Sequence, residues 1–194
     1  PMSRARAAQG SLLLAKAQRL LEAGRDPAAA VAEGSALWSK ALGEGLGRPS
    51  ARMEGAMETA FGQLLLADHA LGTGKDPLLP LQGAQASLQE LLRTEPADVD
   101  VRLELARVLR RIGEAQARRG QDPVPILEEA KAHIDSYLQV FPSNGSAWNH
   151  LGSLARMQAE VAARSGSDPG PFLDIAAAAF GNAWRIRPRA ALSK

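Results

Sequence analysis

Apolar residues recur at intervals of three and four along most of this chain. The clearest stretch runs from residue 101 to 119, where the apolar positions include Leu105, Val108, Leu109 and Ile112. Such spacing places the apolar side chains on one face of a helix. No segment alternates in the manner of a strand, so the pattern predicts an all-α protein.

A short pattern, Gly-x-Asp-Pro, punctuates these helices four times. It begins at Gly24, Gly74, Gly120 and Gly166, with successive starts 50, 46 and 46 residues apart. Glycine suits the left-handed residue that closes a helix. Asp can then cap the next helix, and proline fits its first position. Each copy therefore predicts a joint between two helices.

The residues that flank each joint also repeat. The seventh, eleventh and fourteenth places after the proline share one helical face, and in the fourth unit they hold Ala176, Phe180 and Ala183. Seventeen residues before each proline stands a small residue: Gly10, Ala60, Ala106 or Gly152. In three units a second proline follows nineteen residues after the first, and we expect it to end the second helix: Pro96, Pro142 and Pro188.

These repeats predict an α-solenoid of about eight helices, formed by four helix-turn-helix units within one domain of residues 1–194. The units cover about residues 3–46, 50–96, 99–142 and 145–188. Pro1-Met2 resembles a pair left by protease cleavage, which predicts a piece excised from a longer protein. We expect the last helix to lack a capping helix and to be covered by a partner, a second copy or further chain.

The fourth unit resembles the tetratricopeptide (TPR) repeat. Its consensus-like residues, in order, are Trp148, Leu151, Gly152, Ala176, Phe180, Ala183 and Pro188. The gap between Gly152 and Ala176 is about twelve residues longer than in the usual 34-residue unit, which two longer helices would account for. The resemblance implies a module that docks a protein or peptide on its concave helical surface.

Long units, Gly-x-Asp-Pro joints and helices rich in Ala and Arg also resemble the TPR segments of myxobacterial serine/threonine protein kinases. That resemblance implies a second function: a regulatory or dimerising region of a bacterial kinase, with a homodimer as one outcome. The glycine-rich loop, His-Arg-Asp and Asp-Phe-Gly motifs of a kinase domain are absent from these 194 residues.

The resemblance further implies which residues face the groove. In the fourth unit they are Ser146, Asn149, Ser153 and Arg156; in the third, Asp100, Leu103, Arg107 and Arg110; in the second, Glu54, Met57, Phe61 and Leu64. An asparagine with arginines resembles the carboxylate-holding arrangement of some peptide-binding TPR domains. The further lysine and asparagine of that arrangement are missing here.

The most charge-biased stretch lies between Val101 and Arg119, with six arginines against Glu104 and Glu114. Arg107, Arg111 and Arg118 share a stripe that could receive an acidic or phosphorylated segment, because guanidinium groups pair well with carboxylate and phosphate. Alternatively, Glu114 pairs within the helix with the arginines four residues away, and the face is only solvated.

Two apolar features have a packing interpretation beside a functional one. Phe61 and Leu64, with Leu65 and Leu66, could floor a hydrophobic groove for a partner, but core packing between repeats explains them as well. Trp38, Trp148 and Trp184 are interpreted as packing aromatics.

The composition of the chain narrows the classes of function that remain. A net charge of +2 is too small to imply nucleic acid binding, and no apolar run is long enough to span a membrane. The chain has no cysteine, which fits a reducing cytoplasm. His69, His133 and His150 lack the i, i+4 spacing of a helical metal pair. We therefore expect a cytoplasmic protein with no catalytic residues, no metal site and no cofactor.

Overall fold

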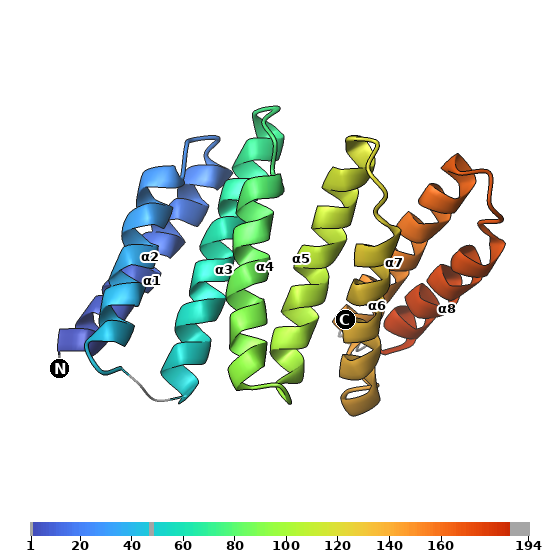
Figure 1. Ribbon diagram of the computed structural model, residues 1–194. Helices are drawn as coiled ribbons and strands as arrows, with labels where there is room; N and C mark the ends of the chain where they lie inside the picture. Colours follow the sequence, from blue (N-terminus) through green and yellow to red (C-terminus); the bar gives the residue numbers. More distant parts are fainter. Residues whose placement is uncertain (1, 47–48, 187–194) are drawn as a thin grey trace, which may run out of the picture. The chain divides into compact units, whose positions relative to one another are not determined.

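A computed structural model describes residues 2–46 and 49–186, and the regular structure in them is entirely helical (Figure 1). The eight helices within these ranges are α1 (Met2–Glu22), α2 (Ala28–Gly43), α3 (Pro49–Gly72), α4 (Leu78–Thr94), α5 (Val99–Arg118), α6 (Val124–Val140), α7 (Gly145–Arg164) and α8 (Gly170–Ile186). The predicted all-α class and the helix number are confirmed.

The chain divides into two compact units, Pro1–Ala97 and Asp98–Lys194. In the first unit, α1 packs on α2 and α3 packs on α4, while α3 also contacts α1 and α2. In the second unit, α5 packs on α6 and α7 packs on α8, while α7 also contacts α5 and α6. Each unit is thus two stacked helix pairs, the arrangement of a helical repeat. We call the first helix of each pair the A helix and the second the B helix.

The four Gly-x-Asp-Pro joints have the geometry that their sequence predicts. Each glycine is left-handed, with φ between 68° and 78°. At the third joint, Gln121 donates its N–H to the carbonyl of Gln116 at 3.0 Å, as in the helix-closing Schellman motif. The Asp122 carboxylate then accepts from the N–H of Val124 at 3.0 Å, which caps α6. The same bonds recur at the other joints.

The joints that lead from a B helix to the next A helix differ between units. Helices α4 and α6 end two residues before Pro96 and Pro142, as expected, whereas Pro188 lies outside the described residues. Helix α2 instead ends before Gly45, whose φ is 94°. The side chains of Asp98 and Asn144 cap α5 and α7 by accepting backbone N–H groups at 3.0 Å. We had not predicted these two caps.

Small residues bring the helices of a pair together. A methyl group placed on Gly10 of α1 would lie 2.8 Å from Cδ1 of Trp38 and 2.9 Å from the carbonyl oxygen of Gly34 on α2. Trp38 is only 1% exposed, and its Nε1 donates to Oγ of Ser11 at 3.2 Å. The interpretation of Trp38 as a packing aromatic is confirmed. That of Trp184 is wrong, because 77% of its surface is exposed on α8.

Candidate arginine site on α5 and α7

Helix α5 has one buried apolar face and one arginine-rich face. Asp98 fixes the start of the helix, and Val101, Leu105, Val108 and Ile112 are then all buried. The helical period consequently turns Arg107, Arg110 and Arg111 away from these apolar side chains. Arg107 is exposed, and the other two are half-buried. Leu103, expected on the groove surface, is buried instead.

Helix α7 lies against α5 and adds a histidine and an arginine to the same site. Leu151, Leu154 and Ala155 are buried, which leaves His150 half-buried and Arg156 exposed. Both side chains interact electrostatically with Arg110, and His150 also interacts with Arg107. The structure thus brings together the four arginines predicted for partner binding: Arg107, Arg110, Arg111 and Arg156. We call these four arginines and His150 the arginine site.

Most of these arginines are engaged by glutamates on their own helices. Arg107 donates to both carboxylate oxygens of Glu104, at 2.7 and 2.9 Å. Arg156 pairs with Glu160 at 2.6 Å. The predicted alternative, pairing of Glu114 with the arginines four residues away on α5, is also present, at 2.6 Å to Arg118 and 3.8 Å to Arg110. Because such exposed pairs contribute little stability, they can open to admit a stronger ligand.

Arg110 is the least satisfied member of the arginine site. Its nearest carboxylate, on Glu114, is 3.8 Å away, and that same group is 2.6 Å from Arg118. Nε of Arg110 is buried with no hydrogen-bond partner. Burial, and then the neighbouring arginines, lower the pKa of Arg110, while Glu114 opposes the shift. A buried donor without an acceptor costs free energy.

The pKa of His150 is affected by the positive charges of the arginine site. Burial, together with the charges of Arg107 and Arg110, lowers its pKa to about 4. The imidazole is therefore neutral near pH 7, and its Nε2 lies 3.5 Å from Oγ of Ser146. A neutral imidazole beside guanidinium groups can donate one further hydrogen bond to an anion.

This arrangement suits an acidic ligand with several acceptor oxygens. The guanidinium groups of Arg107 and Arg110 offer forked donors that match carboxylate or phosphate geometry. Within residues 2–46 and 49–186, no group of three or more His, Asp or Glu side chains is placed to hold a metal ion.

Asn149 directly precedes His150 on α7, and its side chain is exposed. It lines an open cleft of about 790 Å³, formed where α6 ends, α7 begins and α8 ends. Tyr137, Phe141, Ser146 and Ile186 are among the other residues that line this cleft. None of the four arginines is among the residues that line this cleft, and the joint carboxylate-holding arrangement that the TPR resemblance suggested stays a prediction.

Phe61 and Leu64 belong to the first unit. They lie on α3, where Phe61 is 36% exposed and Leu64 is half-buried. Leu65, beside them, is 5% exposed and belongs to the core cluster that also contains Leu14 and Trp38. Phe61 and Leu64 therefore border this core, and a groove for a partner at this place stays a prediction.

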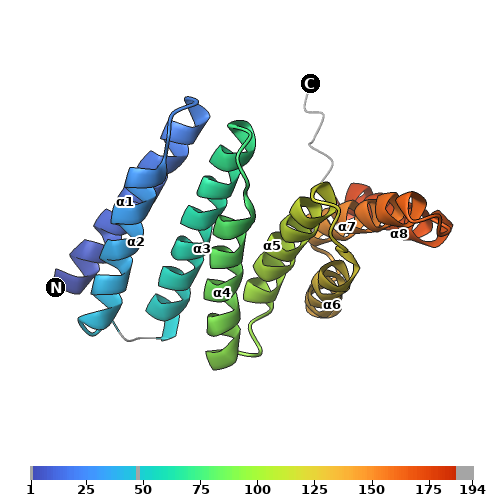
Figure 2. The ribbon, with the colours of Figure 1, turned by 45° about the horizontal axis from the view of Figure 1, so that its top comes forward.

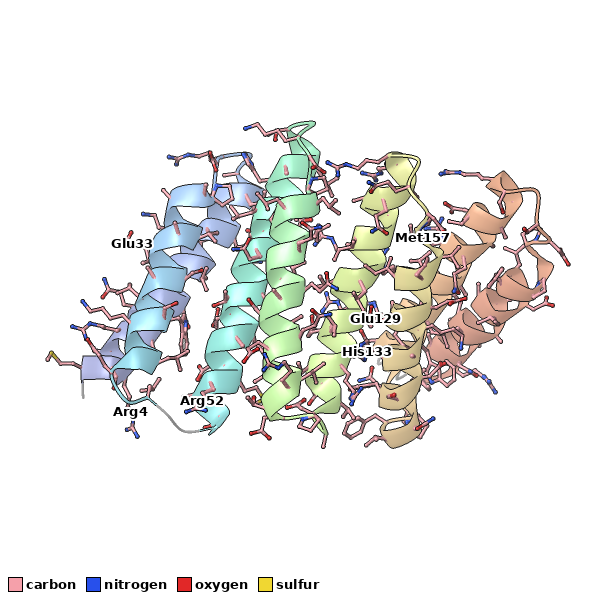
Figure 3. All side chains as sticks on the ribbon, viewed as in Figure 1. Arg4, Glu33, Arg52, Glu129, His133 and Met157 are labelled. Carbon is pink, nitrogen blue, oxygen red and sulfur yellow. The ribbon has the colours of Figure 1, made fainter. Side chains whose placement is uncertain are left out.

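The remaining histidines belong to other contacts. His133 lies one turn from Glu129 on α6, with Nε2 3.8 Å from the carboxylate (Figure 3). Burial lowers the pKa of His133, and Glu129 partly offsets that shift. His69 on α3 approaches the carboxylate of Asp26 in the first joint at 3.8 Å. Neither histidine joins the arginine site.

His150 is the member of the arginine site that we did not predict. We interpreted it as an ordinary surface or packed histidine. The available signal was its place one turn after Ser146, on the helix that the resemblance assigned to the groove. Its closeness to Arg107 depends on how α7 packs on α5, and sequence spacing does not give that distance.

Compared with protein-family models and with curated proteins, the sequence matches none. The structure therefore defines the class only as an all-α protein of stacked helix pairs. Among the described residues, no helix is both long enough and apolar enough to cross a membrane.

Proposed function

We propose that this chain is a protein-interaction module of the TPR type, which docks an acidic or phosphorylated segment of another protein. The segment lies over α5 and α7, and Arg107, Arg110 and Arg156 hold its negative groups. The observation that carries the proposal is that Arg110 lies within a cluster of positive charge and that its buried Nε has no acceptor.

Two further features support this assignment. The stacked helix pairs leave the polar sides of A helices α5 and α7 accessible. Arg107 on α5 and Arg156 on α7 are both exposed. Their present partners, Glu104 and Glu160, make exposed ion pairs that a ligand with several oxygens can displace.

The test uses a fluorescent peptide that carries two phosphoserines, with the same unphosphorylated peptide as its reference. We expect fluorescence anisotropy to show that the intact chain binds the phosphorylated form more tightly, and that added salt weakens the complex. The double variant Arg107→Glu, Arg110→Glu should lose at least about tenfold in affinity, since it removes two charge-assisted contacts.

Arg93→Glu is the matched control, because Arg93 pairs with Glu90 three residues earlier on α4, as Arg107 pairs with Glu104. It should bind as the unaltered chain does. Circular dichroism verifies that the double variant remains helical. Equal affinity of the double variant and the control for the phosphopeptide would refute the proposed site.

A regulatory or dimerising region of a bacterial serine/threonine kinase is the second function that we propose. It is supported by an exposed apolar stripe on α8, which contains Leu173, Phe180 and Trp184 and could associate with another copy. A kinase domain encoded in the same gene product would favour this function, and a different neighbouring domain would count against it.

A further inference from the structure

Helix α8 carries an apolar stripe that is open to solvent. Leu173, Ala177, Phe180 and Trp184 follow one another at intervals of four, three and four residues, so they share one helical face. Leu173 is 50% exposed, Phe180 38% and Trp184 77%. We call these four residues the α8 stripe. A continuous exposed apolar patch of this kind marks an interaction surface.

The equivalent residues on α2 form a contact between helix pairs. Counted from the proline of the joint, the positions of the α8 stripe correspond to Val31, Ser35, Trp38 and Leu42. A methyl group placed on Gly55 of α3 would lie 2.9 Å from Leu42 and 3.1 Å from Trp38. One placed on Gly62 would lie 3.0 Å from Val31. These α2 positions are therefore the face against which the next A helix packs.

Phe180 and Trp38 illustrate the difference between a covered and an uncovered face. On one side, each aromatic ring packs on a glycine of its own pair, Gly152 for Phe180 and Gly10 for Trp38. On the other side, α3 covers Trp38, which is 1% exposed. Among the described residues the main contact of α8 is with α7, and Phe180 stays 38% exposed (Figure 2). The α8 stripe thus has the shape of a face that receives a helix.

We propose that a second copy of this chain covers the α8 stripe, with the two α8 helices antiparallel about a twofold axis. Such a pairing is self-complementary. When Leu173 lies opposite Trp184 of the second copy, Ala177 lies opposite Phe180 of that copy. The ring of Phe180 then meets a small residue and that of Trp184 meets a leucine, and no charged group of the α8 stripe is buried.

Charge complementarity favours the antiparallel direction. Asp174 follows Leu173 directly and Arg185 follows Trp184 directly, so both lie on the same flank of the α8 stripe. Both are exposed. In an antiparallel pair, this flank of one helix lies beside the same flank of the other. Asp174 therefore lies beside Arg185 of the second copy, and the contact occurs twice.

A head-to-tail assembly, with α1 of another copy on the α8 stripe, is less favourable. The α1 positions that correspond to the α2-facing side of α3 hold Ala5, Gln9, Leu12 and Lys16. Burying the amide of Gln9 and the ammonium of Lys16 against apolar side chains costs free energy, because neither group would find a partner there. The symmetric pairing avoids that cost.

The first test measures the mass of the whole chain in solution by sedimentation equilibrium. We expect a reversible dimer, which Trp184→Glu weakens at least about tenfold, as expected for a central interface tryptophan. Leu79→Glu is the matched control, because Leu79 is 78% exposed on α4. It should leave the dimer unchanged. A chain that stays monomeric at high concentration would overturn the proposal, as would a dimer that Trp184→Glu leaves intact.

The second test fixes the direction of the helices. The chain has no cysteine, so Asp174→Cys and Arg185→Cys each supply one unique thiol. Oxidation of an equal mixture should produce a disulfide-linked dimer between the two variants, with far less linkage when either is oxidised alone. Efficient linkage within each variant alone and none between them would overturn the antiparallel arrangement. Both tests are independent of peptide binding at the arginine site.

Discussion

At the residue scale, glycine sets how closely the paired helices approach. Gly10 and Gly34 face each other between α1 and α2, where neither position has room for a methyl group. Gly152 does the same on α7, where a methyl group would lie 2.7 Å from the ring of Phe180. A helix-interior glycine normally weakens its helix. Here the close packing of an aromatic residue compensates for that loss.

We expect Gly10→Ala to destabilise the protein by about 1–3 kcal/mol, because the new methyl group must displace Trp38 or the backbone of Gly34. The measurement is the free energy of unfolding in urea. Gly43→Ala is the control, since a methyl group there meets nothing within 4 Å. It should be neutral or stabilise α2 slightly. Equal stability of the Gly10 variant and the unaltered chain would show that α1 and α2 do not pack closely at Gly10.

At the element scale, the Gly-x-Asp-Pro joints define where one helix ends and the next begins. The left-handed glycine closes the A helix, and the aspartate caps the B helix two residues later. These joints could be predicted from the sequence because each bond involves residues a few places apart. Each joint is therefore determined by one contiguous stretch of chain.

Removing one aspartate cap should destabilise its helix measurably. We expect Asp122→Ala to lower the unfolding free energy by about 1 kcal/mol, because the N–H of Val124 loses its acceptor. The measurement is a chemical denaturation curve. Glu128→Ala, at an exposed place on the same helix, should change the value by less than about 0.5 kcal/mol. If both variants lost the same amount, the cap would have no special part in stability.

Contacts between elements were harder to predict than the elements themselves. The helical spacing predicted eight helices, and Arg107, Arg110 and Arg156 were selected as partner-binding residues. The packing of α7 on α5, which brings His150 to these arginines, depends on side chains far apart in the sequence. Trp184 was misinterpreted for a similar reason, because a helix is buried only where another helix packs on it.

At the scale of the whole molecule, the same plan occurs in both compact units. Each unit stacks two helix pairs, and in each the second A helix contacts both helices of the first pair. In the second unit this contact creates the arginine site from α5 and α7. The α8 stripe lies on another helix of that unit, so peptide binding and self-association use different side chains.

The measurement that tests the arginine site most directly is the NMR titration of His150 with and without the doubly phosphorylated peptide. Burial and the charges of Arg107 and Arg110 hold the pKa of this histidine at about 4. A dianion bound beside those arginines would offset their charge and favour the imidazolium form.

We predict that the phosphorylated peptide raises the pKa of His150, whereas the unphosphorylated peptide does not. His133 on α6 is the internal control, and its pKa should be the same with and without peptide. A titration curve of His150 that saturating phosphopeptide leaves unmoved would contradict the account.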